Sequence, residues 1–378
     1  MRIDKAMQAV RDTGLDALLV LTPANTYYVS GFRAITYSRP VMVVLGKEPA
    51  LIIPELEFTH AQDRSQIPRI RTYSDMALGG LAGKSTFQLA ADLCVDTLRE
   101  SGLRGRRIGY EPTGITVDGY EYLSAAWGAP LVPVKDTIER LRMVKEAAEL
   151  HLVRAGAELA ELGMSIEVEA STAGTSEIEI MALGNAAMLV EAARRHPDLN
   201  VTAGSRPVSG DKTVLPHSIP SGKRLAAGDV VIHGTGCVTN GYCSEDERTI
   251  FVGAPTAEQR RVFDVMLRAQ LAAIGAIRPG RPCKDVDHAA RAVIEEAGYG
   301  AAFIHRTGHG MGIDVHEPPF FAASDDTIIA PGMVMSVEPG IYLPGLGGFR
   351  HSDTIFVTED GCEVVTKYPK TLPEVIVA

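Results

Sequence analysis

Four short segments in the C-terminal part of the chain contain the residues that could do chemistry. They are LPHSIPSG (215–222), GYCSEDERTIFVG (241–253), HRTGHGMGIDVHEPPF (305–320) and SVEPGIYLPGLGGFRHSD (336–353). Each places histidine or acidic residues among glycine and proline, in the kind of loop or strand end that a ligand can approach. One such segment is typical of a surface turn, whereas four of them predict a shared binding or catalytic site.

The second segment holds a dense acidic run, Glu245-Asp246-Glu247, which is followed by Arg248. Neighbouring carboxylates repel one another strongly in a poorly solvated site unless a positive group joins them. The run is compatible with a metal site, with a cradle for a cationic substrate, or with a solvated turn. Because side chains alternate along a strand, we expect Asp246 to point away from Glu245 and Glu247.

The elements that must position these segments indicate two domains. Residues 1–135 alternate strand-like runs such as 17–21 with amphipathic stretches such as 87–102, which predicts an α/β domain. Residues 136–378 open with a long helical stretch over 136–169 and continue with helices and strand-like runs, which predicts an α+β domain. A chain of 378 residues is also too long for one average hydrophobic core.

Composition and charge argue against several classes of protein. The net charge is −10 and no basic block offsets it, which argues against a nucleic-acid-binding protein. Charged residues interrupt the N-terminal apolar run, and no apolar stretch of about 18 residues or more is present to span a membrane. The five cysteines form no C-x-x-C pair and are odd in number, which indicates a reducing compartment. We therefore expect a cytoplasmic protein.

The order and the residues of the four segments resemble those of the creatinase/methionine and proline aminopeptidase family, whose fold is called pita-bread. The motifs that carry the resemblance are G-Y-x-S-x-x-x-R-T, G-H-G-x-G, H-E-x-P and E-P-G-I-Y. The first domain resembles the creatinase-type N-domain, so the likeness covers essentially the whole chain. It implies an α/β N-terminal domain followed by an α+β pita-bread catalytic domain.

The resemblance also implies positions for metal ligands, and several of them are changed in this chain. Metallopeptidases of this family hold two divalent ions with two Asp, one His and two Glu. The Asp positions fall on Gly234 and Glu245, the His position on His309, and the Glu positions on Glu338 and Ser352. Glycine offers no donor and serine binds hard ions weakly, so these changes favour a site without metal.

A metal site of different composition stays open. An alignment shifted by one residue would offer His233 and His351 as replacement ligands. His233 could then join Glu245, His309 and Glu338 in holding a single ion.

Three residues resemble the metal-free creatinase branch position by position. His217 lies in the matching L-P-H segment, Glu247 directly precedes Arg-Thr, and Glu338 lies in S-x-E-P. The resemblance implies that His217 activates water or carries a proton to the departing nitrogen. Glu247 and Glu338 would hold the cationic group of the substrate.

Further residues are expected to line the substrate pocket. His309 and His316 would stabilise the developing tetrahedral centre, with Glu245 beside them. In the N-domain, Tyr37 and Arg39 of YYVSGFRAITYSRP fall on an aromatic-x-Arg pair that reaches the partner subunit's active site in creatinase. The resemblance therefore implies a homodimer in which Arg39 clamps a substrate carboxylate.

The sequence thus predicts a metal-independent hydrolase, without a cofactor, that cleaves a C–N bond of a small guanidino or amidino acid or of a cyclic amidine. Creatine itself is disfavoured, because Phe320 stands where creatinase has a further arginine. Two alternatives stay open. One is a metal-dependent Xaa-Pro-type aminopeptidase or dipeptidase with an altered metal site, and the other is a non-catalytic binding protein that has kept the pita-bread fold.

Overall fold

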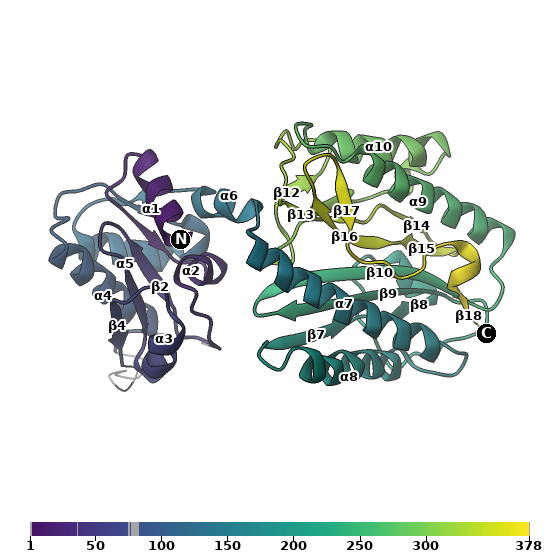
Figure 1. Ribbon diagram of the computed structural model, residues 1–378, viewed down its shortest axis with the longest axis horizontal. Coiled ribbons are helices and arrows are strands. Elements are labelled where there is room, and N and C mark those ends of the chain that lie inside the picture. The colour runs from purple at the N-terminus through teal and green to yellow at the C-terminus, as the bar shows by residue number, and fades with distance from the viewer. Residues whose placement is uncertain (1, 36, 75, 77–82, 378) are drawn as a thin grey trace. The chain divides into compact units, whose positions relative to one another are not determined.

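The chain folds into two compact units, Met1–Arg142 and Met143–Ala378, each with its own sheet (Figure 1). The structure is a computed structural model. It describes residues 2–35, 37–74, 76 and 83–377. The division between the units lies at the end of the first helix of the stretch 136–169, whereas the sequence placed the domain boundary at its beginning.

The N-terminal unit is built on a six-stranded mixed sheet with the order β4-β3-β2-β1-β5-β6. Its strands are β1 (Ala17–Val20), β2 (Met42–Leu45), β3 (Ala50–Pro54), β4 (Ile70–Tyr73), β5 (Ile108–Tyr110) and β6 (Val132–Pro133). Its helices are α1 (Arg2–Asp12), α2 (Pro23–Ser30), α3 (Phe58–Arg64), α4 (Thr86–Glu100), α5 (Val117–Trp127) and α6 (Thr137–Met143). Every residue of β1 is buried, and strands pair with both of its edges.

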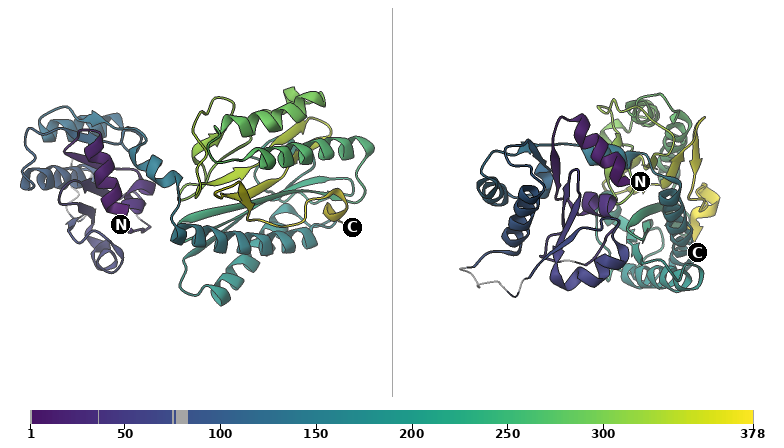
Figure 2. Two further views of the ribbon diagram at one scale, coloured as in Figure 1. Left: turned by 45° about the horizontal axis from the view of Figure 1, so that its top comes forward. Right: turned by 60° about the vertical axis from the view of Figure 1, so that its left-hand side comes forward.

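The C-terminal unit contains a ten-stranded sheet whose main path is β12-β11-β13-β16-β10-β9-β7, and a separate two-stranded sheet, β14-β15. Its strands are β7 (Val201–Ser205), β8 (Val208–Ser209), β9 (Val230–Thr239), β10 (Tyr242–Val252), β11 (Gly308–Gly310), β12 (Glu317–Phe321), β13 (Val334–Val337), β14 (Gly340–Leu343), β15 (Gly347–Arg350), β16 (Ser352–Val357), β17 (Cys362–Val364) and β18 (Ile376–Val377). Its helices are α7 (Ala147–Ala170), α8 (Glu177–Arg195), α9 (Ala257–Ala276) and α10 (Lys284–Glu296). The helices pack in two pairs, α7 with α8 and α9 with α10 (Figure 2).

The single long helix expected over 136–169 is in fact two helices, α6 and α7. The backbone between them leaves the helix because Val144 forms an antiparallel bridge with Met333. Lys145 turns inward, where its Nζ lies 2.7 Å from Glu317 Oε1 and both side chains are almost fully buried. These are contacts with distant parts of the chain, so a helical pattern in the local sequence does not reveal the break.

The β9–β10 hairpin carries much of the polar chemistry of the C-terminal unit. It turns at Asn240 and Gly241, whose φ angles of 43° and 86° are those that a two-residue Asn-Gly turn requires. The register places Glu247 opposite Gly234. All of β10 is buried, with β9 paired to one edge and β16 to the other.

An aromatic cluster holds the hairpin against its neighbours in the hydrophobic core. The ring of Phe251 in β10 lies 5.6 Å from Phe263 in α9 and 6.3 Å from Phe349 in β15, measured between ring centroids. All three side chains are buried, so the strands that carry the polar residues rest on a packed hydrophobic core.

Of the helices that the structure describes, none combines the length and apolar character needed to cross a membrane.

Candidate active site

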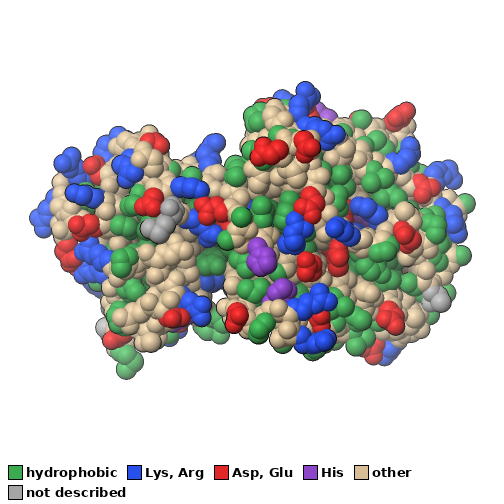
Figure 3. All heavy atoms as spheres, viewed as in Figure 1, with side chains coloured by type: hydrophobic (Ala, Val, Ile, Leu, Met, Phe, Trp, Pro, Cys, Tyr) green, Lys and Arg blue, Asp and Glu red, His purple; other side chains and the backbone are tan. Residues whose placement is uncertain are grey.

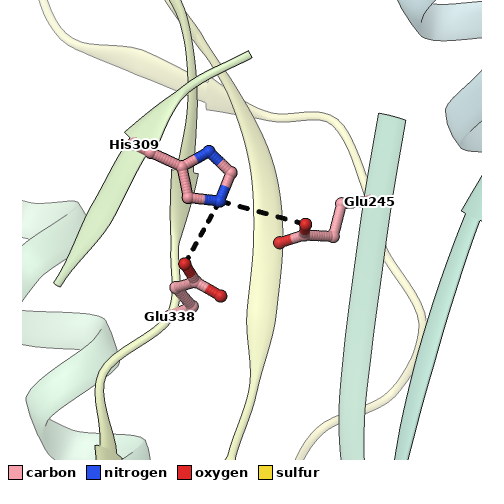
Figure 4. A group of neighbouring side chains, drawn as sticks. All are labelled: Glu245, His309 and Glu338. Carbon is pink, nitrogen blue, oxygen red and sulfur yellow. Dashed lines mark ion pairs between the residues drawn. The ribbon is translucent and has the colours of Figure 1, made fainter. Parts of the chain in front are cut away.

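Three polar side chains from separate strands meet at one point in the C-terminal unit (Figure 4). Glu245 comes from β10, His309 from β11, and Glu338 directly follows β13. His309 Nε2 lies 3.2 Å from Glu338 Oε1 and 4.0 Å from Glu245 Oε2. Because one ligand atom from each residue lies within 4.8 Å of the others, a single cation would be within reach of all three.

The imidazole of His309 is oriented by the backbone of its own strand. Its Nδ1 donates a hydrogen bond to the carbonyl oxygen of Gly310 at 3.1 Å, which leaves Nε2 directed at the two carboxylates. The side chain is fully buried. Metal-ligating histidines are commonly held in this way, with one ring nitrogen bonded to a carbonyl and the other facing the ion.

The three groups share their protons unevenly. Burial, aided by the charge of Glu338, raises the pKa of Glu245 to about 7. Burial also disfavours the ionised form of Glu338, but its contact with His309 prevails and lowers the pKa to about 2. Burial acts to lower the pKa of His309, yet the two carboxylates raise it to about 9. Near neutral pH the cluster therefore holds an imidazolium–carboxylate pair beside a titrating Glu245, and a cation that binds there must displace protons.

Ser352 orients the carboxylate of Glu245. Its hydroxyl donates to Glu245 Oε1 at 2.6 Å, while Oε2 of the same carboxylate faces His309. Ser352 is paired with Glu247 in the β10–β16 ladder, which brings it to the same region of the sheet. Ser352 supplies a hydrogen bond there, but it has no negatively charged atom that could bind a metal ion.

Glu247 extends its carboxylate across the hairpin into the space beside Gly234. A Cβ atom added at Gly234 would lie only 3.0 Å from Glu247 Oε1, so the missing side chain makes room for this carboxylate. Arg350 binds the carboxylate through two nitrogens, Nη2 to Oε1 at 2.8 Å and Nε to Oε2. The arrangement is a buried, forked ion pair, which is the strongest geometry available to these two groups.

Arg350 also links this ion pair to neighbouring segments. Its Nη1 donates to the hydroxyl of Tyr342 at 3.1 Å and to the carbonyl oxygen of Pro216 at 3.2 Å. The charge of Glu247 is therefore already neutralised within the chain. This contradicts the expectation that Glu247 holds a cationic substrate group, because that group would have to displace a buried guanidinium.

His316 lies against the cluster of Glu245, His309 and Glu338, and its own side chain is exposed to solvent. Its ring centroid is 3.9 Å from that of His309, and its Nδ1 accepts a hydrogen bond from Arg306 Nη2 at 3.1 Å. Partial burial and the positive charge of His309 lower its pKa to about 4, with smaller contributions from Arg306 and His217. The predicted catalytic His217 is exposed and within electrostatic reach of His316. On the face drawn in Figure 3, histidine side chains reach the surface of this unit between acidic and basic ones.

His233 and His351 do not face the cluster, so the four-ligand metal site that includes His233 is wrong. His233 Nδ1 lies 3.0 Å from Glu167 Oε2, and its Nε2 lies 3.0 Å from Ser171 Oγ. His351 Nδ1 accepts from the backbone N–H of Thr249, and its Nε2 is 3.2 Å from a backbone carbonyl oxygen. Both imidazoles are fully buried with both ring nitrogens engaged.

The alternation expected along the acidic run is confirmed. Glu245 and Glu247 lie on the face of β10 that carries the cluster, whereas Asp246 forms an ion pair with Arg248 at 2.6 Å. Arg248 also contacts Asp353 at 2.9 Å. The three adjacent carboxylates are thus divided between two faces, with Arg350 bound to Glu247 on one face and Arg248 bound to Asp246 on the other.

Tyr37 and Arg39 lie in the N-terminal unit, in the connection between α2 and β2. Tyr37 is 88% exposed. Their contribution to a partner subunit's site stays a prediction.

Arg350, Tyr342 and Arg306 are residues of the site that the sequence analysis missed. All three belong to the polar segments singled out above, and Tyr342 is part of the E-P-G-I-Y motif. Their role comes from contacts across strands, such as the pair between Glu247 and Arg350. Spacing along the chain carries no signal for such a pair.

Comparison with known proteins shows the family of both units. Residues 2–144 match the creatinase/prolidase N-terminal domain, and residues 146–359 match metallopeptidase family M24. The chain is 31% identical over 371 residues to the Xaa-Pro dipeptidase of Pyrococcus furiosus, covering 98% of this chain and 99% of that one. It is 30% identical over 374 residues to the putative dipeptidase YkvY of Bacillus subtilis, with 98% and 99% covered.

Solved structures agree with these relatives. The Xaa-Pro dipeptidase from Bacillus anthracis superposes with a TM-score of 0.87 at 30% identity, covering 100% of this chain and 99% of that chain. The prolidase from Pyrococcus horikoshii OT3 superposes with a TM-score of 0.85 at 30% identity, covering 98% and 99%. The predicted fold, a creatinase-type N-terminal domain followed by a pita-bread domain, is confirmed.

The same comparisons overturn the functional expectation. Relatives that match over their whole length include proteins named Xaa-Pro dipeptidases, and the matching family is one of metallopeptidases. A metal-independent amidinohydrolase of the creatinase-like branch is therefore the wrong assignment. The chain belongs to metallopeptidase family M24, with a creatinase/prolidase N-terminal domain preceding its pita-bread unit.

Proposed function

We propose that this protein hydrolyses small Xaa-Pro-type dipeptides with one divalent metal ion held by Glu245, His309 and Glu338. The observation that carries the proposal is the convergence of these three donors within 4.8 Å of one another. The whole-length similarity to proteins named Xaa-Pro dipeptidases supports the substrate class.

The donor set suits one ion. One imidazole nitrogen and two carboxylates form the kind of three-ligand set that catalytic zinc sites and other divalent-metal sites use, with positions left open for substrate. The bond from His309 Nδ1 to the Gly310 carbonyl leaves Nε2 as the ligand atom. Deprotonated Glu245 and Glu338 add two negative charges that a divalent cation would neutralise.

Among the residues that the structure describes, a second ion finds no comparable set of donors. Gly234 has no side chain, and the hydroxyl of Ser352 donates its hydrogen to Glu245. The carboxylate of Glu247 is held by Arg350. The site therefore differs from the two-ion arrangement that the family resemblance implied.

The bound ion would act as a Lewis acid on the scissile carbonyl. His316 is neutral at physiological pH, because its pKa is lowered to about 4. Its Nδ1 accepts from Arg306, an obligatory donor, so its proton resides on Nε2. That N–H is a hydrogen-bond donor for the negative charge that develops on the carbonyl oxygen. His217 remains the predicted carrier of a proton to the departing nitrogen.

The test combines metal content with peptide cleavage. Protein stripped with a chelator is titrated with Zn²⁺, Mn²⁺ or Co²⁺ while bound metal and the hydrolysis of Ala-Pro are measured. We expect activity to require metal and to saturate near one ion per chain. His309→Ala should abolish both metal binding and activity, while His151→Ala, an exposed histidine in α7, should change neither.

Two results would contradict the proposal. Full activity after complete chelation would show that the ion is unnecessary. A stoichiometrically metallated protein that cleaves no Xaa-Pro peptide would instead favour the non-catalytic binding protein.

A further inference from the structure

Arg306 places a positive charge beside the proposed site without a carboxylate to neutralise it. Among the residues that the structure describes, no Asp or Glu forms an ion pair with its guanidinium. By contrast, Arg350 is paired with Glu247, and Arg248 is paired with Asp246 and Asp353. A half-buried arginine near a reaction site that lacks an anionic partner is suited to an anionic group of the substrate.

Two neighbours hold the guanidinium in place. Its central carbon lies 4.5 Å from the centroid of the Phe320 ring, in a cation–π contact. One of its nitrogens, Nη2, donates to His316 Nδ1 at 3.1 Å. Arginine has five N–H donors in a planar fork, so this bond leaves donors available for a carboxylate.

The position of Arg306 fits the dimensions of a dipeptide. The ring centroids of His309 and His316 are 3.9 Å apart, and Arg306 is hydrogen-bonded to His316 on the far side. The guanidinium is therefore one imidazole away from the proposed metal ligand. In a dipeptide, one nitrogen and one Cα separate the scissile carbonyl carbon from the terminal carboxylate carbon, a span of roughly 3 to 4 Å. A peptide bound at the cluster would bring its C-terminus close to Arg306.

We propose that Arg306 is a specificity-determining residue that binds the terminal carboxylate of the substrate. The inference rests on the proposed peptidase function and names the residue that would confine the reaction to dipeptides. Longer peptides would place an uncharged amide beside the guanidinium, and its remaining donors would lose their anionic partner.

The experiment compares Ala-Pro with its C-terminal amide, Ala-Pro-NH2, in the wild-type protein and in Arg306→Gln. We expect the wild type to prefer the free acid. The substitution should raise KM for Ala-Pro by about 10-fold or more, because a charge-assisted hydrogen bond is lost, while KM for the amide should change little. Loss of the contact with His316 should lower kcat for the acid and the amide alike. Arg306→Lys keeps the charge but not the fork, so it should retain part of the preference.

The amide also separates carboxylate binding from an effect on His316. If Arg306 served only to position His316, its removal would slow acid and amide equally, and the proposal would be wrong. The matched control is Arg154→Gln, which removes another arginine that stacks on a phenylalanine, 5.0 Å from the centroid of the Phe356 ring. This control should leave the ratio between the two substrates unchanged.

A binding measurement distinguishes failure of this inference from failure of the proposed function. If the wild type cleaves neither peptide, the peptidase proposal fails, and calorimetric titration with proline and with prolinamide still tests Arg306. Weaker binding of proline to Arg306→Gln, with prolinamide unaffected, would support the carboxylate contact. Equal binding of proline to both proteins would overturn it.

Discussion

At the scale of single residues, protons and a metal ion compete for the same atoms of Glu245 and His309. The pKa of Glu245 is raised to about 7 by burial and by Glu338, and that of His309 is raised to about 9 by the two carboxylates despite burial. Both groups are ligands only when deprotonated. Each therefore releases a proton when a cation binds at a pH below its pKa.

Metal affinity should accordingly increase as the pH rises. The Glu245 contribution levels off above a pH of about 7, and the His309 contribution continues to about 9. Together they predict binding of Mn²⁺ on the order of 100-fold tighter at about pH 8.5 than at about pH 6.5. Titration calorimetry in buffers of different ionisation heat measures both the affinity and the protons released. An affinity that does not change with pH would show that these protons are absent.

At the scale of elements, the β9–β10 hairpin combines a missing side chain on one strand with an acidic side chain on the other. Gly234 and Glu247 are direct partners in the register, and the carboxylate of Glu247 occupies the space beside Gly234. Arg350 from β15 then binds this carboxylate. The hairpin thereby places one carboxylate against Arg350. Either of the two paired positions could carry that carboxylate.

Gly234 and Glu247 should therefore be energetically coupled. Glu247→Thr leaves the buried Arg350 without its carboxylate and should lower the free energy of unfolding by about 3 kcal/mol. Gly234→Asp alone should also destabilise, because its Cβ would lie 3.0 Å from Glu247 Oε1. In the double variant the new aspartate can pair with Arg350, so the loss should be smaller than the sum by about 2 kcal/mol.

Denaturant unfolding of the four proteins of this cycle measures the coupling. Gly204→Asp in β7 is the matched control, because a Cβ there would meet only a backbone oxygen at 3.8 Å. Its effect should add to that of Glu247→Thr without coupling. If the changes in the free energy of unfolding also add for Gly234→Asp and Glu247→Thr, a carboxylate at one position does not replace the carboxylate at the other.

At the scale of the whole molecule, the remaining prediction concerns assembly. The likeness of the segment containing Tyr37 and Arg39 to creatinase implies that these residues act in the partner subunit's site. The proposed catalytic unit is then a homodimer in which each site combines residues of two chains. Arg39 belongs to the N-terminal unit and Glu338 to the C-terminal unit, so the two can be inactivated separately.

Mixing two inactive variants tests this arrangement. Arg39→Ala and Glu338→Gln should each lose most peptidase activity. In dimers reassembled from an equal mixture, half are mixed and each mixed dimer has one complete site, so roughly a quarter of the wild-type activity should return. Recovery that requires chain exchange would support a shared site. Activity that stays absent in verified mixed dimers would show that Arg39 acts within its own chain or has no catalytic part.

Local sequence patterns were sufficient for the family and the fold. The motifs around His309 and Glu338 led to the pita-bread fold, and strand alternation separated Asp246 from its neighbours. Both depend on short-range order along the chain, which a single sequence displays directly. The changed ligand positions at Gly234 and Ser352 were also visible, but without their neighbours they suggested a metal-free amidinohydrolase.

The sequence by itself singled out the segments that carry Glu245, His309 and Glu338, and it determined which face of β10 each carboxylate of the acidic run occupies. Only the tertiary structure decided how those carboxylates are used. Glu247 meets Arg350, 103 residues away along the chain, and His233 is bonded to Glu167, 66 residues away. These partners are brought together by strand pairing and helix packing, so no local pattern predicts them. The pairing leaves Glu245, His309 and Glu338 as the three donors that face one another.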